Sequence, residues 1–131
     1  MNIGALAKTT GIAAKTIRYY ESVGLLAAPA RSEGNYRVYG ERDEATLRFV
    51  QRARHLGFSI KEVGDLVALW RDQHRASADV RALATAHLGE IERKLGELEV
   101  MRATLRHLIR RCHGDTRPDC PIIDELAVGA E

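Results

Sequence analysis

The sequence predicts a mainly α-helical protein in which a small N-terminal globular part precedes one long helix. All seven aromatic residues lie within the first 70 of the 131 residues, so the material for a core is concentrated there. Apolar or small residues then recur from Val80 to Cys112, where nine steps cover 32 residues. That spacing is about 3.6 residues per step, the period of an α-helix. The only two cysteines, Cys112 and Cys120, follow at the end of this segment.

The charge of the chain is unevenly distributed. Twenty Lys and Arg against eighteen Asp and Glu give a net charge of +2, which argues against a histone-like polycation. Residues 1–54 hold nine basic and five acidic residues, a net charge of +4, whereas residues 55–131 hold eleven and thirteen, a net charge of −2. The N-terminal part therefore carries the basic excess that nucleic-acid binding requires.

Two short helices joined by a glycine-containing turn are expected at the N-terminus. The first covers residues 3–8, with Asn2 as its N-cap, and Thr9-Thr10-Gly11 ends it. The second covers residues 14–23, with Gly24 at the position after its C-cap. This order is the skeleton of a helix-turn-helix.

A small hairpin and two further helices are expected next. Residues 25–39 predict the hairpin, with its turn near Gly34. The third helix is predicted from Asp43, as its N-cap, to His55. Ser59-Ile60-Lys61-Glu62 is a capping box that opens a fourth helix. The fourth helix is expected to bury four residues, Val63, Leu66, Val67 and Trp70.

The longest predicted element is a helix over residues 79–111, which contain no proline. It would be ~50 Å long at 1.5 Å per residue. The rest of the chain is too small to cover its apolar stripe, and a second copy of the same helix is the simplest cover. We therefore expect a homodimer with three parts per chain: a basic helix-turn-helix part over 1–70, a linker and dimerisation helix over 71–111, and a loop and short helix over 112–131.

The second predicted helix has a face suited to DNA if Ile17 and Tyr20 point to the core. Basic and hydroxyl side chains on one helix face fit the major groove, although a solvated helix face has the same composition. The following basic hairpin favours the DNA interpretation, because it then forms a wing on the DNA backbone. The outward candidates on the helix are Lys15, Thr16, Arg18, Tyr19 and Ser22; those on the wing are Arg31, Asn35, Tyr36 and Arg37; Arg54 is a further candidate.

The segment from Cys112 to Cys120 is a candidate metal site. Two soft thiolates in a short loop suit a soft monovalent ion such as Cu(I), whereas zinc normally takes four ligands and only His113 is an obvious local addition. Pro121 can open a short helix over 121–127, whose N-terminus would favour a Cys120 thiolate. A disulfide or two inert thiols remain as alternatives.

No catalytic constellation is present in the sequence, so an enzyme is not expected. The spacing of the cysteines is not the C-x-x-C of redox enzymes, and there is no glycine-rich phosphate loop. No segment approaches the roughly 20 apolar residues of a membrane span, and the N-terminus lacks the apolar core of a signal peptide. We expect a cytoplasmic protein with reduced thiols. The rival classes are a redox enzyme or thiol switch, a small-molecule-responsive DNA binder and a plain coiled-coil adaptor.

Two N-terminal segments read TIRYYESVGLL and RSEGNYRVY, and the long helix is followed by CHGDTRPDCPII. The first two resemble the MerR family of transcriptional regulators, and the third resembles its copper-efflux branch, the CueR or HmrR type. The resemblance implies a winged helix-turn-helix domain, linker helices and an antiparallel coiled-coil dimer. It also implies that Lys15, Arg18 and Tyr20 belong to the DNA-reading helix, and Tyr36 and Arg37 to the wing.

The same resemblance matches Cys112 and Cys120 to two metal-binding thiolates, with one ion per subunit. Ser77 stands where divalent-metal sensors of the family carry a cysteine that serves the other subunit, which favours Cu(I), Ag(I) or Au(I) over Zn(II) or Hg(II). Two thiolates and Cu(I) leave one negative charge, which Arg81 of the other subunit is expected to compensate. Ala13 and Ala14 stand where relatives often carry a Ser or Thr that caps the DNA-reading helix, and the loss of that cap is expected to cost ~1 kcal/mol of local stability.

The function implied by the resemblance is activation of copper-efflux or detoxification genes. The dimer is expected to bind promoter DNA with or without metal, and to bend and untwist an overlong promoter spacer for RNA polymerase when metal is bound. A thiol or redox switch of the same family, or a zinc-responsive regulator, is the alternative.

Overall fold

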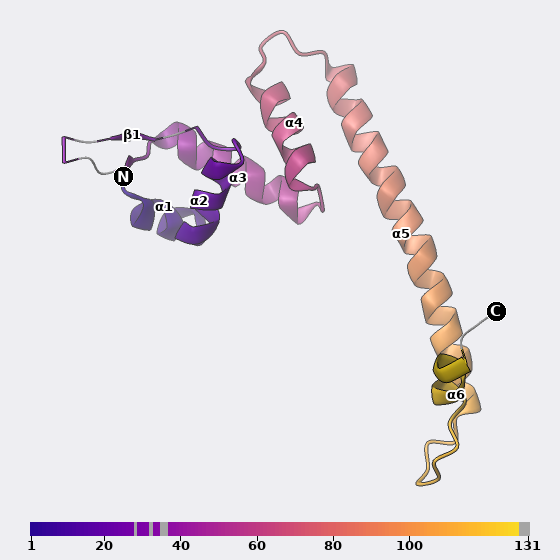
Figure 1. Cartoon of the computed structure of the whole chain (residues 1–131). Helices are drawn as coiled ribbons and strands as arrows, with labels where there is room; N and C mark the ends of the chain where they lie inside the picture. The colour runs from indigo at the N-terminus through magenta and orange to yellow at the C-terminus, as the bar shows by residue number, and fades with distance from the viewer. Residues whose placement is uncertain (28, 32, 35–36, 129–131) are drawn as a thin grey trace. The chain divides into compact units, whose positions relative to one another are not determined.

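The computed structural model describes residues 1–27, 29–31, 33–34 and 37–128 (Figure 1). Along the chain the described elements are α1, α2, β1, β2, α3, α4, α5 and α6. They divide into two compact units, Met1–Thr85 and Ala86–Glu131. None of the described helices combines the length and the apolar character needed to cross a membrane.

Helix α1 (Ile3–Thr10) begins as predicted and ends later than predicted. The side-chain oxygen of Asn2 accepts a hydrogen bond from the backbone N–H of Ala5 at 2.8 Å, which is the predicted N-cap. Thr9 and Thr10 do not break the helix, because their hydroxyls donate to carbonyls one turn earlier in the same helix. The helix ends instead at Gly11, whose φ of +75° suits glycine.

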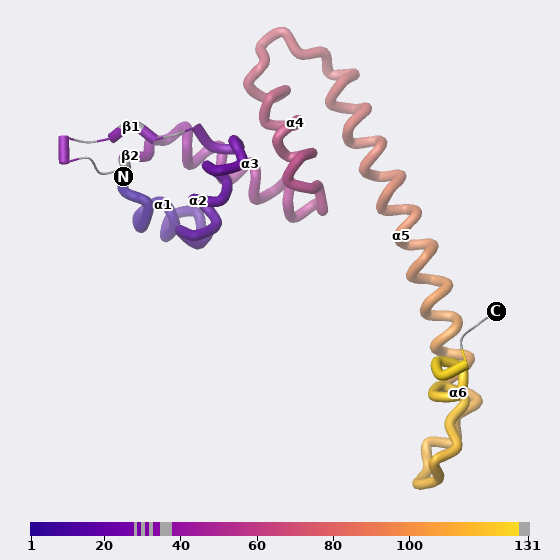
Figure 2. Tube along the Cα trace, in the orientation of Figure 1, coloured from indigo at the N-terminus to yellow at the C-terminus, as the bar shows by residue number. Residues whose placement is uncertain are grey.

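Helix α2 (Ala14–Ser22) completes the predicted helix-turn-helix. Its N-cap is Ala13, which supplies no side-chain hydrogen bond to the helix, as an alanine at this position predicts. The hairpin that follows contains β1 (Ala30–Arg31) and β2 (Arg37–Val38), which Figure 2 labels. The two strands pair antiparallel, and Arg31 lies opposite Arg37. The two strands are short, and Gly34 lies in the turn between them as predicted.

Helix α3 (Glu41–His55) starts earlier than predicted. Asp43 is not its N-cap; Gly40 occupies that position, and Asp43 lies in the first turn. The Asp43 carboxylate accepts a hydrogen bond from the Gly40 N–H at 2.8 Å. The prediction was wrong because the Asp43 side chain caps the helix from its first turn, by accepting the N–H of the N-cap residue Gly40, and not from the N-cap position itself.

Helix α4 (Ile60–Arg71) begins with the predicted capping box. The Ser59 hydroxyl accepts from the Glu62 N–H at 3.1 Å, and the Glu62 carboxylate accepts from the Ser59 N–H at 2.8 Å. Near its end, Trp70 stacks on Phe49 of α3, with ring centroids 4.5 Å apart and an interplanar angle of 4°. Trp70 is therefore half-buried by a partner ring rather than enclosed in the core.

The N-terminal unit has a core of its own. Twelve buried hydrophobic residues form one cluster, and Leu66 and Val67 of α4 pack against it half-buried. Burying an aliphatic or aromatic side chain contributes about 1.5–3 kcal/mol, so this cluster provides most of the stabilisation of the unit. Its largest fully buried side chains are Tyr39, Leu6, Ile17, Leu47, Val50 and Val63.

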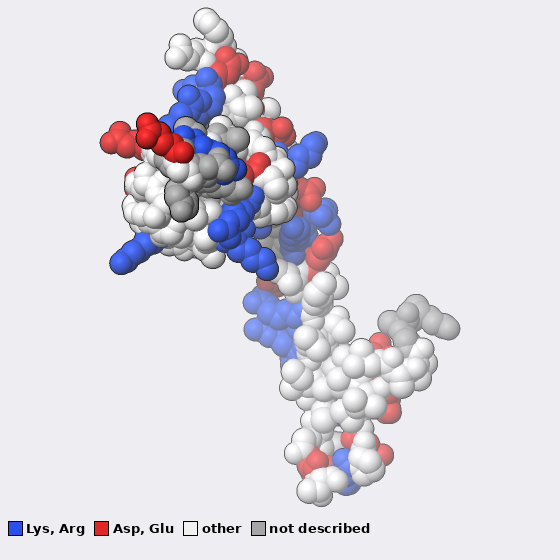
Figure 3. Space-filling model, turned by 60° about the vertical axis from the view of Figure 1, so that its left-hand side comes forward, with Lys and Arg blue, Asp and Glu red and all other residues white. Residues whose placement is uncertain are grey.

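Helix α5 (Ser77–Arg111) is continuous over 35 residues, as the periodicity predicts, and α6 (Pro121–Val128) follows the cysteine loop. Among the described residues of 86–128, Leu108 is the only buried hydrophobic side chain. Most other described side chains of this unit lie at its surface. In Figure 3, residues other than Lys, Arg, Asp and Glu make up most of the surface around α6 and the adjoining end of α5.

Candidate nucleic-acid interface and metal centre

Helix α2 presents basic and hydroxyl side chains to solvent. Lys15 and Arg18 are exposed, Tyr19 is 49% exposed, and Thr16 is half-buried. Ile17 is fully buried, so the residues on either side of it point outward as predicted. Lys and Arg side chains project from this unit in Figure 3. The exposed set can reach phosphates and base edges if the helix enters a major groove.

Tyr20 does not share this exposed face. Its side chain is 8% exposed and belongs to the core cluster. Its ring centroid lies 6.0 Å from that of the exposed Tyr19, with the two ring planes tilted by 49°. Tyr20 therefore points to the core, as the helical pattern predicted, and its ring has a packing role there. Its contact with DNA stays a prediction.

The end of α1 is held by two side chains that the sequence did not single out. Arg48 donates to the carbonyl of Thr9 at 3.2 Å, and Gln51 donates to the carbonyl of Thr10 at 3.3 Å. Carbonyls in the last turn of a helix lack partners within that helix, so α3 supplies them. Positions 48 and 51 are three residues apart on one face of α3, which is the only sequence signal that groups them.

The hairpin candidates are only partly described. Arg31 is exposed on β1, and the backbone of Arg37 pairs with it across the hairpin. Asn35 and Tyr36 lie outside the described residues. Arg54, the further candidate, donates to the carbonyl of Phe58 at 2.7 Å and so bridges the turn between α3 and α4. Its contact with DNA stays a prediction beside this structural role.

The two thiols lie at the ends of neighbouring helices and face each other. Cys112 continues the last turn of α5, with its N–H 3.2 Å from the carbonyl of Leu108. Cys120 opens α6, because its carbonyl accepts the N–H of Asp124 at 3.0 Å. The two sulfurs are 3.8 Å apart, and both cysteines are free and half-buried. The structure therefore brings together the pair that the sequence predicts.

The start of α6 favours the thiolate form of Cys120. Its pKa is lowered from the ordinary value, first by the backbone N–H of Ile123 and then by that of Ile122 and by Cys112. Partial burial and the Asp124 carboxylate oppose this shift. Unpaired N–H groups in the first turn of a helix stabilise an adjacent anion, so Cys120 is prepared to act as a soft anionic ligand.

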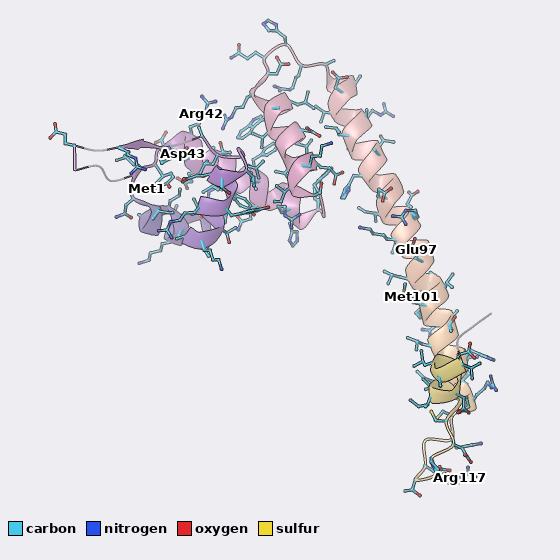
Figure 4. The ribbon with its side chains drawn as sticks, viewed as in Figure 1. Met1, Arg42, Asp43, Glu97, Met101 and Arg117 are labelled. Atoms are coloured by element: carbon cyan, nitrogen blue, oxygen red, sulfur yellow. The ribbon has the colours of Figure 1, made fainter. Side chains whose placement is uncertain are left out.

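The loop between the thiols is stabilised by its own polar contacts. Asp115 accepts the N–H of Arg117 at 2.9 Å and pairs with its guanidinium at 2.8 Å; Figure 4 labels Arg117 on this loop. In the part of the chain that is described, no group of three or more His, Cys, Asp or Glu could hold a metal ion. Among the described residues, the soft donors that lie together within one chain are the two sulfurs.

Two sulfurs fit a single soft ion. Metal–sulfur bonds of about 2.3 Å can span up to about 4.6 Å between two sulfurs. The observed separation of 3.8 Å lies within that span. A donor set of two thiolates and nothing else suits ions that accept low coordination and prefer sulfur.

Ser77 and Arg81 lie at the start of α5. Ser77 is its first residue, and both side chains are exposed. They belong to the N-terminal unit, whereas the thiols belong to the other unit. Their expected role concerns the metal loop of a second subunit and stays a prediction.

Helix α5 carries an exposed apolar stripe beside an ion-paired face. Arg93 pairs with Glu90 at 2.9 Å and with Glu97 at 2.6 Å, and Figure 4 labels Glu97 and Met101 one helical turn apart. The stripe consists of Leu88, Ile91, Leu95, Leu98, Met101 and Leu105, which are 37–57% exposed. An apolar stripe of this length along a helix matches a helix–helix interface.

Two family models match the chain in overlapping segments. The model described as MerR HTH family regulatory protein matches residues 1–69, and the model described as MerR, DNA binding matches residues 44–108. Together they cover residues 1–108, which include the whole N-terminal unit and the first half of the other.

Whole-chain relatives are also found. Heavy metal-dependent transcription regulator 2 of Rhizobium meliloti (strain 1021) is 55% identical over 130 residues, which cover 99% of this chain and 88% of the relative. The HTH-type transcriptional regulator CueR of Salmonella typhimurium is 45% identical over 127 residues, or 97% and 92% of the two chains. The solved structure of the transcription regulator PbrR691 from Ralstonia metallidurans CH34, in complex with lead(II), matches with a TM-score of 0.86 and 35% identity, covering 96% and 98%.

Proposed function

The chain belongs to the MerR family of helix-turn-helix transcriptional regulators, which are not enzymes, and we propose that it responds to a soft monovalent metal ion. The proposed ion is Cu(I), with Ag(I) and Au(I) of the same chemistry, held by Cys112 and Cys120 at one ion per subunit. The observation that carries this proposal is the isolated pair of thiols 3.8 Å apart, one of which has a lowered pKa.

The donor set distinguishes a monovalent from a divalent ion. Zinc sites are usually completed by four ligands, and no third His, Cys, Asp or Glu joins the two thiols within the described chain. We further propose that Ser77 of the second subunit withholds a third thiolate. Arg81 of that subunit would then offset the negative charge that two thiolates leave around a monovalent ion.

The DNA-binding part of the proposal rests on α2 and the hairpin. Lys15, Arg18 and Tyr19 lie on the exposed face of α2, and the stripe on α5 would join two chains so that two such faces meet one promoter. We propose the same three parts that the sequence predicts, 1–70 for DNA, 71–111 for dimerisation and 112–131 for sensing.

Regulation is proposed to act through two conformations of the dimer. The ion, when bound, supplies two bonds that tie the end of α5 to the start of α6. This tie can change transcription only if it favours one dimer conformation over the other. The favoured conformation is proposed to bend and untwist an overlong promoter spacer, so that RNA polymerase can start at copper-efflux genes.

The decisive test is an anaerobic titration of the full chain with Cu(I) against a chelator, with Zn(II) in parallel. We expect one Cu(I) per chain, held much more tightly than Zn(II). Cys112→Ser and Cys120→Ser should each abolish Cu(I) binding and induction of a reporter while leaving DNA affinity unchanged. His113→Ala is the matched control within the loop and should keep Cu(I) binding. Equal affinity for Zn(II), or loss of DNA binding in the cysteine variants, would contradict the proposal.

The DNA-reading face is tested by a pair of arginine variants. Arg18→Ala should weaken DNA binding by roughly tenfold or more, because a good base contact contributes about 1–3 kcal/mol. Arg110→Ala removes the same charge from α5 and should leave DNA affinity close to that of the wild type. Equal losses in the two variants would show that the exposed face of α2 has no special role.

A thiol switch is the second candidate, and the 3.8 Å separation of the sulfurs favours keeping it. A disulfide needs the sulfurs to approach to about 2.05 Å, a modest movement for two cysteines flanking a loop. Mild oxidation of the metal-free protein, followed by thiol counting and transcription in vitro, separates the two candidates. Activation by the disulfide without metal would favour the switch.

A further inference from the structure

One buried tyrosine connects the hairpin to the DNA-reading helix. Tyr39 directly follows β2, is 1% exposed, and is among the largest fully buried side chains. Its hydroxyl donates a hydrogen bond to the carboxylate of Glu21, which lies in the last turn of α2 and 18 residues earlier in the chain. Its backbone N–H donates to the carbonyl of Met1 at 2.7 Å, so the main chain holds the same residue in place.

Packing alone does not require the hydroxyl of Tyr39. A phenylalanine ring would fill nearly the same volume in the core cluster and would bury no polar group. A hydrogen bond to a carboxylate is stronger and more directional than packing contacts, so it restricts how far the end of β2 can move relative to α2. The tyrosine therefore adds a positional constraint to an otherwise apolar contact.

The two elements joined in this way carry the two proposed kinds of DNA contact. Lys15 and Arg18 lie on α2, and Arg31 and Arg37 lie on the paired strands of the hairpin. Contacts to the DNA backbone set the register in which a helix meets the bases. If the hairpin could shift relative to α2, the hairpin could contact the DNA backbone only in positions where α2 loses its contacts to the bases.

We propose that Tyr39 and Glu21 are positioning residues that hold the hairpin at a set offset from α2, so that both engage one duplex together. The inference rests on the proposed DNA-binding function. In it, Tyr39 and Glu21 contribute to DNA binding by positioning the hairpin and not by contacting DNA. Its consequence is that loss of the hydroxyl uncouples the hairpin contacts from the helix contacts.

The test is Tyr39→Phe in the full-length protein, which removes only the hydroxyl. Binding is measured over a range of salt concentrations to a duplex that the wild-type protein has enriched from a random-sequence pool. We expect about tenfold weaker binding. We also expect the salt slope to decrease in magnitude by about 2, because each hairpin of a dimer loses one phosphate contact at about 0.9 per phosphate. Hydroxyl-radical protection should be lost at the outer positions and kept at the centre of each half-site.

The controls separate positioning from stability. Glu21→Gln keeps an acceptor oxygen and should retain the wild-type salt slope. Glu21→Leu removes the acceptor and should reproduce the effect of Tyr39→Phe. It replaces Tyr39→Phe as the test if Tyr39→Phe does not fold. Thr46→Val removes a buried hydroxyl bonded to the Arg42 carbonyl at 2.8 Å on α3, so it should lower stability and leave the slope unchanged. A wild-type affinity and slope in Tyr39→Phe would overturn the inference. Failure of the wild-type protein to enrich any duplex would instead overturn the proposed function.

Discussion

The two units of the chain differ in where their apolar side chains lie. Of the thirteen buried hydrophobic side chains among the described residues, twelve form the core of the N-terminal unit and only Leu108 belongs to the other. The stripe on α5 instead leaves Leu95, Leu98 and Met101 more than half exposed. Burial of such a side chain contributes about 1.5–3 kcal/mol, which the C-terminal unit by itself does not obtain. The N-terminal unit thus has a core of its own, whereas the described apolar side chains of the C-terminal unit lie mostly at its surface, where the proposed dimer would bury them.

The largest expected effect comes from charging the exposed stripe. Leu98→Glu would place two carboxylates in the proposed interface of a dimer, and an uncompensated polar group costs several kcal/mol when buried. We expect the dimer dissociation constant to rise by at least about 1,000-fold, or about 4 kcal/mol, measured by analytical ultracentrifugation. The core of the N-terminal unit should stay folded.

Ala103→Glu is the matched control for this change. It adds the same carboxylate about 140° around the helix from Leu98, at about 100° per residue. The variant should remain dimeric. If Leu98→Glu also remained dimeric, the contrast between the two units would have to be explained without a partner chain.

Truncation of one leucine in each unit sharpens the comparison. Leu47 is fully buried, so Leu47→Ala should lower the free energy of unfolding by about 2–5 kcal/mol through lost burial and a cavity. Leu98→Ala should act mainly on dimerisation, so its effect on unfolding should depend on protein concentration. Thermal and urea denaturation at two concentrations checks both, and a concentration-dependent effect in Leu47→Ala would contradict the assignment.

A gain of stability is expected at the start of the DNA-reading helix. Ala13 supplies no side-chain cap to α2, and its φ and ψ of −60° and 143° already suit a capping residue. Ala13→Ser should therefore stabilise the N-terminal unit by about 0.5–1 kcal/mol. Ala82→Ser, within α5, lacks an unpaired helix start and serves as the control. No gain in the melting temperature of Ala13→Ser would show that the uncapped end is already satisfied.

The smallest expected effect concerns the thiol at the start of α6. The pKa of Cys120 is lowered, chiefly by the backbone N–H of Ile123, so its thiolate persists to lower pH than that of an ordinary cysteine. In metal-free Cys112→Ser protein, the alkylation rate of Cys120 should reach half its maximum at a lower pH than that of N-acetylcysteine amide. A midpoint equal to or above that of the free thiol would count against helix stabilisation of the thiolate.

Features encoded by neighbouring residues were predictable from the sequence. The capping box of Ser59 and Glu62, the glycine after α2 and the period of α5 each depend on residues within a few positions of one another. Local chemistry also explains the errors. Asp43 was misplaced because an acidic side chain can cap a helix from inside its first turn, and the Thr9 and Thr10 hydroxyls were satisfied within α1.

Features that depend on distant residues were not predictable. Arg48 bonds to a carbonyl 39 residues earlier in the chain, and Tyr39 reaches Glu21 from the far side of the hairpin. For Tyr20 the helical pattern predicted only that the ring turns to the core, while the residues that bury it come from several elements of the core cluster. The cysteine pair was predictable because its members are only eight residues apart. A short loop between two residues keeps them close whatever the rest of the fold is.

The short spacing of the two cysteines separates the proposed thiol ligands from the proposed DNA-binding surface along the sequence. Both sulfurs and the loop between them are encoded by one uninterrupted stretch, residues 112–120, whereas the proposed DNA-binding surface draws on α2 and the hairpin. Replacing this one stretch would exchange both proposed thiol ligands and the loop between them without altering a residue of α2 or the hairpin, whereas Ser77 and Arg81 of α5 lie outside it. The proposed metal ligands and the proposed DNA-binding surface can therefore change independently of each other in evolution, because different parts of the gene encode them.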